Sequence, residues 1–236
     1  QHASCPQRVF VGVYQDRRTA SDVRQILRGD NLRVYDAYRH NSVTGIMRCR
    51  RLIHGERTAM FMDHGAMPGP GWDDKVLRAL AEAGRKHHRA VLTILTDARG
   101  NRCFPTWGPT LNVGSRAFSD TQDDDPVQVL AATPVVCLAR TRLWEQVELP
   151  GTTALDLTVA LHDAGARFYA PRRDLAMAAP ASCVAPVPVG PATGPSVPAR
   201  KAYMDFAGLR VRRDGTVAVS GRAFLGVVRR SDVSAK

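Results

Sequence analysis

The chain has 236 residues, of which 44% are hydrophobic and 23% are charged, and its formal net charge is +11. This length can bury one sizeable core, and no apolar run approaches the roughly 18 residues that a membrane-spanning helix needs. The basic excess favours an anionic partner. Such partners are nucleic acid, a nucleotide, an acidic protein or a membrane surface. Nucleic-acid binding is the least favoured functional hypothesis, because the basic residues are dispersed and form no recognised nucleic-acid-binding motif.

The first half of the chain alternates short apolar runs with helical patterns. Apolar runs of strand length lie at 8–13, 32–35, 58–62 and 90–95. Helical periodicity marks residues 21–28, 45–54 and 73–85, with Asp73 as the expected cap of the third helix. The runs at 8–13, 58–62 and 90–95 predict buried strands of one sheet, so the pattern indicates an α/β sandwich.

The second half continues with strands at 127–130, 134–139 and 167–171 and a helix at 153–164. Residues 101–122 show little periodicity and predict a long loop. The prolines of 179–199 exclude a helix or a central strand, and Asp214-Gly215 between alternating apolar residues predicts a hairpin. The predicted organisation is an α/β domain at 8–178, a Pro-rich linker or strap at 179–200 and a C-terminal hairpin and tail at 201–236.

One carboxylate stands where an α/β sheet binds its ligands. Asp63 directly follows the apolar run 58–62, and a loop rich in proline and glycine comes next. Ligands of open α/β sheets bind at the carboxyl ends of the strands, so Asp63 is expected at an exposed strand end as a binding residue. Aspartate is also common in turns, so a purely structural role for Asp63 stays open.

The stretch 55–73 resembles the core motif of a family of protein-modifying N-acetylglucosaminyltransferases that includes the Skp1-hydroxyproline GlcNAc-transferase. The residues that carry the resemblance are Gly55-Glu56, Asp63 and Pro70-Gly71-Trp72-Asp73. A second segment, Gly165 with Phe168-Tyr169-Ala170-Pro171, is also similar. The resemblance implies a nucleotide-sugar transferase of the GT-A type, with UDP-GlcNAc as donor, a protein hydroxyl as acceptor, and a divalent metal, manganese or magnesium.

The same resemblance assigns roles to three residues, and His64, which departs from the family, is a fourth candidate. Asp63 would bind the metal, with the adjacent His64 as a substitute ligand if the chain turns at Asp63. Arg50 would contact the diphosphate, since a guanidinium forks onto phosphate oxygens. Asp16, at the end of the first strand, would contact the nucleotide.

The chain departs from the family at several functional positions. His64 and Gly65 stand where the family has serine and histidine, Thr153 and Ala154 replace a pair of acids, and Ala178 replaces a later histidine. Two hypotheses therefore stay open. The chain is either a transferase, or a degenerate transferase fold that serves as a structural or binding component of a larger assembly.

Overall fold

The computed structural model describes residues 2–16, 30–37, 49–63, 65–97, 99–108, 113–118, 124–148, 153–179, 197–211 and 217–219. Its centre is a five-stranded sheet in the order β3 (Thr58–Met62), β10 (Val136–Arg140), β5 (Ala90–Thr93), β11 (Arg167–Ala170) and β9 (Val127–Val129). Strand β10 runs antiparallel to β3 and to β5, and β11 is parallel to β5. The carboxyl ends of β3, β5 and β11 therefore meet at one edge of the sheet.

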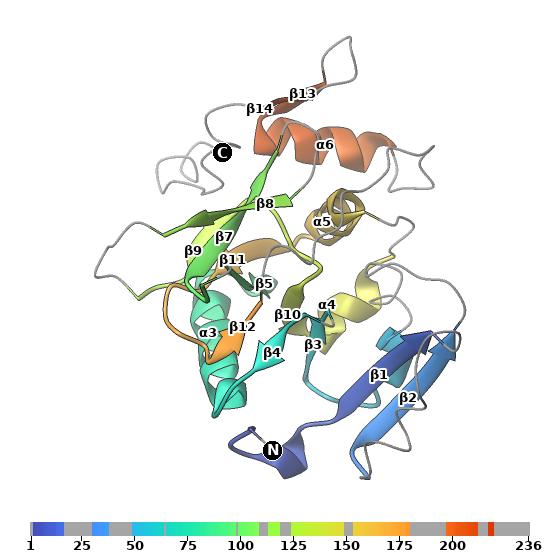
Figure 1. Ribbon diagram of the computed structural model, residues 1–236. Coiled ribbons are helices and arrows are strands. Elements are labelled where there is room, and N and C mark those ends of the chain that lie inside the picture. The colour runs from blue at the N-terminus through green and yellow to red at the C-terminus, as the bar shows by residue number, and fades with distance from the viewer. Residues whose placement is uncertain are drawn as a thin grey trace.

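Apolar side chains cover both faces of this sheet, which explains why its strands are continuous apolar runs. Successive residues of a strand point to opposite faces, so Val91 and Leu92 of β5 belong to two different hydrophobic clusters. Helix α3 (Trp72–Lys86) packs into the cluster of Leu92, and α4 (Thr141–Gln146) into the cluster of Val91. Figure 1 shows these helices around the central strands.

Helix α3 buries a stripe with the spacing of one helical face: Val76, Ala79, Leu80 and Ala83. The prediction that Asp73 caps this helix is wrong. The N-cap is Gly71, with a left-handed φ of 69° that favours glycine, and Asp73 lies inside the first turn. The Asp73 carboxylate is thereby left for other partners.

Strand β1 (Val11–Asp16) corrects a second expectation. It pairs in parallel with β2 (Leu32–Ala37) in a two-stranded sheet and does not join β3 and β5. The run at 8–13 is also less buried than predicted, since Phe10 and Val11 are 43% and 46% exposed. An apolar run establishes strand character better than it establishes burial.

The predicted loop at 101–122 contains two strands. β7 (Arg102–Trp107) pairs antiparallel with β8 (Val113–Ala117) and with β6 (Leu95–Thr96) in a three-stranded sheet. Pro105 and Gly114, which normally argue against strands, concealed this pattern. The predicted helix at 45–54 is described only from Cys49, as a 3-10 turn η2 (Arg50–Leu52), and the predicted helix at 21–28 lies outside the described residues.

The C-terminal part of the chain packs onto the central domain. Helix α6 (Val197–Ala207) contacts α5 (Ala154–Asp163), and β13 (Leu209–Val211) pairs antiparallel with β14 (Val217–Val219). Pro198 stands in the first turn of α6, where proline is tolerated, so the end of the predicted strap is helical. Residues 180–196 of that strap lie outside the described residues.

Among the residues that the structure describes, no helix is both long enough and apolar enough to cross a bilayer.

Candidate functional site

Asp63 stands at the carboxyl end of β3, as the sequence predicts. Its N–H donates to the carbonyl of Val135 at 2.8 Å, which extends the pairing with the β10 side by one residue. Its carbonyl accepts from the N–H of Ala66 at 2.9 Å, so the chain turns sharply at Asp63. This is the turn that His64 would need to face the same ligand, but His64 itself lies outside the described residues.

The turn at Asp63 leads into a junction of three segments. β4 (Met67–Pro68) pairs antiparallel with β12 (Met177–Ala178), which places Ala178 opposite Met67. Gly69 donates to the carbonyl of Ala176 at 2.6 Å, and Thr96 exchanges two hydrogen bonds with Ala179. The topology therefore brings position 178, where the resembled family has a histidine, to the chain that follows Asp63. Two-residue strands have no periodicity, so spacing alone could not predict this pairing.

The described residues do not by themselves form a divalent-metal site. A divalent ion needs several oxygen or nitrogen ligands. Asp63 offers a carboxylate, but Gly65 and Ala178 offer no side-chain donor. No group of three His, Cys, Asp or Glu side chains able to hold a metal exists within the described ranges.

Another carboxylate lies beyond β6, but it is used to build a turn. Asp97 accepts hydrogen bonds from the N–H groups of Arg99 and Asn101, both at 2.8 Å, and from the Asn101 side chain at 2.9 Å. The side-chain bond from Asn101 is the main reason why the pKa of Asp97 lies below its ordinary value. Asp97 thus closes the hairpin between β6 and β7.

The pair of acids of the resembled family is replaced by a helix cap. Thr153 is the N-cap of α5, and its hydroxyl accepts from the N–H of Asp156 at 3.0 Å. The Asp156 carboxylate accepts from the N–H of Thr153 at 3.1 Å, which completes a capping box. Asp156 is 5% exposed and Ala154 is buried as well. The side chains of Thr153 and Asp156 therefore stabilise the N-terminus of α5.

The structure holds Arg50 against backbone carbonyls. Its guanidinium donates to the carbonyls of Val147 and Glu145, the latter at 3.2 Å. Both carbonyls belong to the end of α4 and the residues after it. Arg50 also lines a shallow groove of about 360 Å³ with Arg51, Ile53, Trp144 and Glu145, and Asp63 is not among the lining residues.

Asp16 ends β1 and pairs with Ala37 of β2, so it belongs to a different sheet from Asp63. The four sequence-predicted site residues therefore come from three places. Asp63 and its neighbour His64 follow β3, Asp16 ends the small sheet, and Arg50 lies beside α4.

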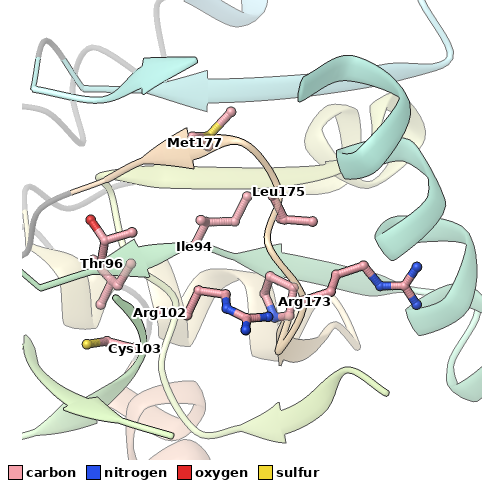
Figure 2. Close-up of a pocket in the computed structure, with 9 residues that line it drawn as sticks. Ile94, Thr96, Arg102, Cys103, Arg173, Leu175 and Met177 are labelled. Carbon is pink, nitrogen blue, oxygen red and sulfur yellow. The ribbon is translucent and has the colours of Figure 1, made fainter. Parts of the chain in front are cut away.

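A small cavity opens near the carboxyl ends of β5 and β11. It is lined by Ile94, Leu95, Thr96, Arg102, Cys103, Pro171, Arg173, Leu175 and Met177 (Figure 2). Its volume of about 10 Å³ accommodates roughly one water molecule, so it is not a nucleotide pocket.

Of the comparisons with known proteins, only the one with solved structures finds matches, and it shows the fold alone. No protein-family model matches the chain, and no curated protein matches it. Among 36 matching chains of solved structures is the crystal structure of GalNAc-T7 with UDP, GalNAc and Mn²⁺, at a TM-score of 0.54 and 7% sequence identity. The match covers 72% of this chain but only 38% of that one.

This likeness defines the class of the fold. The chain has a mixed α/β, GT-A-like fold, which agrees with the α/β sandwich predicted from the sequence pattern and with the fold that the family resemblance implies. At 7% identity the comparison does not support membership in the family of the Skp1-hydroxyproline GlcNAc-transferase.

Proposed function

We propose that this chain is a glycosyltransferase-like protein that binds a UDP-sugar at the carboxyl end of β3 and transfers the sugar slowly or not at all. The observation that carries the proposal is the placement of Asp63. It follows β3, an edge strand of a GT-A-like sheet, at a sharp turn and at the strand end where ligands of α/β sheets bind. The solved structure with the similar fold contains UDP and Mn²⁺.

Low turnover follows from the residues around Asp63. A nucleotide-sugar transferase must stabilise the charge of a departing diphosphate, which needs cations held in fixed positions. Here Gly65 and Ala178 contribute no ligand, and the guanidinium of Arg50 is bound to carbonyls. Asp156, the acid nearest to the replaced pair at 153–154, is part of a capping box. The role that remains is that of a UDP-sugar-binding component, which contacts a protein partner in a larger assembly.

The second candidate is an active enzyme that transfers GlcNAc from UDP-GlcNAc to a protein hydroxyl with manganese or magnesium. The observation that favours it is the turn at Asp63, which is the geometry that His64 would need to act as a ligand beside Asp63. In this case Asp16 contacts the nucleotide and Arg50 leaves its carbonyls for the diphosphate.

A sensitive UDP-release assay with UDP-GlcNAc and manganese separates the two candidates. We expect release at background for the wild type and for Asp63→Ala. Robust release that is abolished by Asp63→Ala and reduced by His64→Ala would instead establish the active transferase. Glu82→Gln is the control, because Glu82 lies on α3 and pairs with Arg173, and neither residue is among the proposed site residues.

A further inference from the structure

The small sheet of β1 and β2 is separate from the five-stranded central sheet. It carries Asp16, yet in the described part of the chain it shares no hydrogen-bonded ladder with the central sheet that carries Asp63. Two strands alone are marginally stable in water, so the small sheet needs attachments to the rest of the protein. Those attachments decide where Asp16 lies relative to Asp63.

We propose that Glu56 and Asp73, the acids near the two ends of the stretch 55–73, are positioning residues that hold the β1–β2 sheet beside β3. Neither residue has a role in the function proposed above, although both belong to the motif that the sequence shares with N-acetylglucosaminyltransferases. The inference rests on the proposed function only in its last step, where the alignment of Asp16 with Asp63 affects the binding of UDP.

Glu56 provides the first attachment, through β2. Its Oε1 lies 2.6 Å from Nη1 of Arg33, and its Oε2 accepts from the N–H of His54 at 2.6 Å. The same Arg33 nitrogen donates to the carbonyl of Leu52 at 2.6 Å. Arg33, the second residue of β2, is thereby bound to the segment that leads into β3.

The surroundings of Glu56 strengthen this pair. Both side chains are 21% exposed, so water screens them only in part. Burial alone would raise the pKa of the Glu56 carboxyl, but the His54 N–H and the Arg33 guanidinium outweigh it and hold the pKa below its ordinary value.

The Leu52 side chain also packs against Gly12 of β1, where an added Cβ would lie 3.0 Å from Leu52 Cδ1.

Asp73 provides the second attachment, through the segment before β1. Its two carboxylate oxygens accept from the N–H of Ser4 at 2.7 Å and from the N–H of Cys5 at 3.0 Å. Gly71, two residues earlier, donates to the carbonyl of His2 at 2.7 Å. The chain then forms the 3-10 turn η1 (Pro6–Arg8) and enters β1.

Asp73 is 6% exposed, and both of its oxygens are satisfied by backbone donors. Burial alone would raise the pKa of its carboxyl, but these N–H groups outweigh it and hold the pKa below its ordinary value. The two attachments precede and follow β3 in the chain, and they hold β2 and the segment that leads into β1. Together they restrain both strands of the small sheet. Figure 1 shows the N-terminal segment leading into β1, with β2 beside β1.

Amide hydrogen exchange read by mass spectrometry tests the proposal without any ligand. The variants are Glu56→Gln, Asp73→Asn and the double variant. Each substitution keeps the size of the side chain and replaces one acceptor by a donor. We expect exchange in residues 11–16 and 32–37 to accelerate by about tenfold or more in the double variant. Exchange in β5 and β10 should stay at the wild-type rate.

Glu82→Gln is the matched control, because it also neutralises a carboxylate of α3 but breaks a different contact, the ion pair with Arg173 at 2.5 Å. It should leave exchange in β1 and β2 unchanged. If the double variant unfolds as a whole, Arg33→Lys replaces it, since lysine keeps the charge but is shorter and lacks the guanidinium whose Nη1 contacts both Glu56 and Leu52. Unchanged exchange of β1 and β2, relative to β5, in the double variant or in Arg33→Lys would overturn the proposal.

A second measurement distinguishes positioning from general stabilisation. The dissociation constant for UDP should rise by about tenfold in Glu56→Gln and Asp73→Asn. It should stay unchanged in Glu82→Gln. Equal affinities in all variants would reject the alignment of Asp16 with Asp63. A wild type that fails to bind UDP would reject the proposed function, while the exchange experiment would still decide whether the two carboxylates hold the small sheet.

Discussion

The indole N–H of Trp107 donates to the hydroxyl of Tyr203 at 2.7 Å, across 96 positions of sequence. The same hydroxyl donates to the carbonyl of Leu130 at 2.6 Å, and Tyr203 is completely buried. Burial raises the pKa of this phenol, so it remains a protonated donor at neutral pH. The hydrogen bonds of the Tyr203 hydroxyl therefore attach helix α6 to the central core, in addition to its apolar contacts.

Tyr203→Phe should destabilise the protein. The substitution leaves the Trp107 N–H and the Leu130 carbonyl without their partner in a dry environment, at a cost of about 1–3 kcal/mol for each unsatisfied group. Urea unfolding followed by tryptophan fluorescence measures the change. Tyr35→Phe, at a half-buried position of β2, is the control and should change the free energy of unfolding far less.

The capping box of α5 makes a separate prediction. Thr153→Ala removes the acceptor of the Asp156 N–H and should lower the free energy of unfolding by about 0.5–2 kcal/mol. Asp156→Ala should have a similar effect, because it removes the side-chain oxygen that accepts from the Thr153 N–H. Both are measured by chemical denaturation. A loss of UDP binding without any loss of stability would mean that these residues belong to the ligand site instead.

The acid dependence of stability should change when Asp73 is neutralised. The pKa of this carboxyl is lower in the folded chain than its ordinary value, so its stabilisation is complete above the unfolded pKa. It is lost as pH falls through the folded pKa. Asp73→Asn should therefore be less stable than the wild type at neutral pH, and the difference should shrink as the pH falls below the ordinary aspartate pKa of about 3.9.

Unfolding in urea at a series of pH values checks this prediction. Asp124→Asn, which neutralises an exposed aspartate, serves as the control. A difference between Asp73→Asn and the wild type that stays constant across the acid range would contradict the role of the ionised carboxylate.

Sequence patterns predicted the elements of the central sheet well, for a physical reason. β3 spans Thr58–Met62 as expected, and α3 and α5 begin and end within one residue of the predicted bounds. These elements bury continuous apolar runs or stripes, and such burial is visible in local periodicity.

The site could be predicted only in part, because its other components depend on long-range contacts. Nothing local to Met67 or Ala178 reveals that they pair, and nothing local to Asp73 reveals that it binds the N–H groups of Ser4 and Cys5. Asp73 has the signature of a helix cap, but Gly71 in the left-handed conformation takes that position. A local pattern was thus correct about the helix and wrong about the carboxylate.

The most direct test of the central claim is the melting temperature of the wild type and of Asp63→Ala with UDP-GlcNAc and manganese. At a tenfold excess over the dissociation constant, binding should stabilise the folded wild type by about 1.4 kcal/mol. For a chain of this length that raises the melting temperature by about 3–6 °C. We predict this rise in the wild type and its loss in Asp63→Ala. A wild type whose melting temperature does not respond at any concentration, or an equal rise in both proteins, would contradict a UDP-sugar site at Asp63.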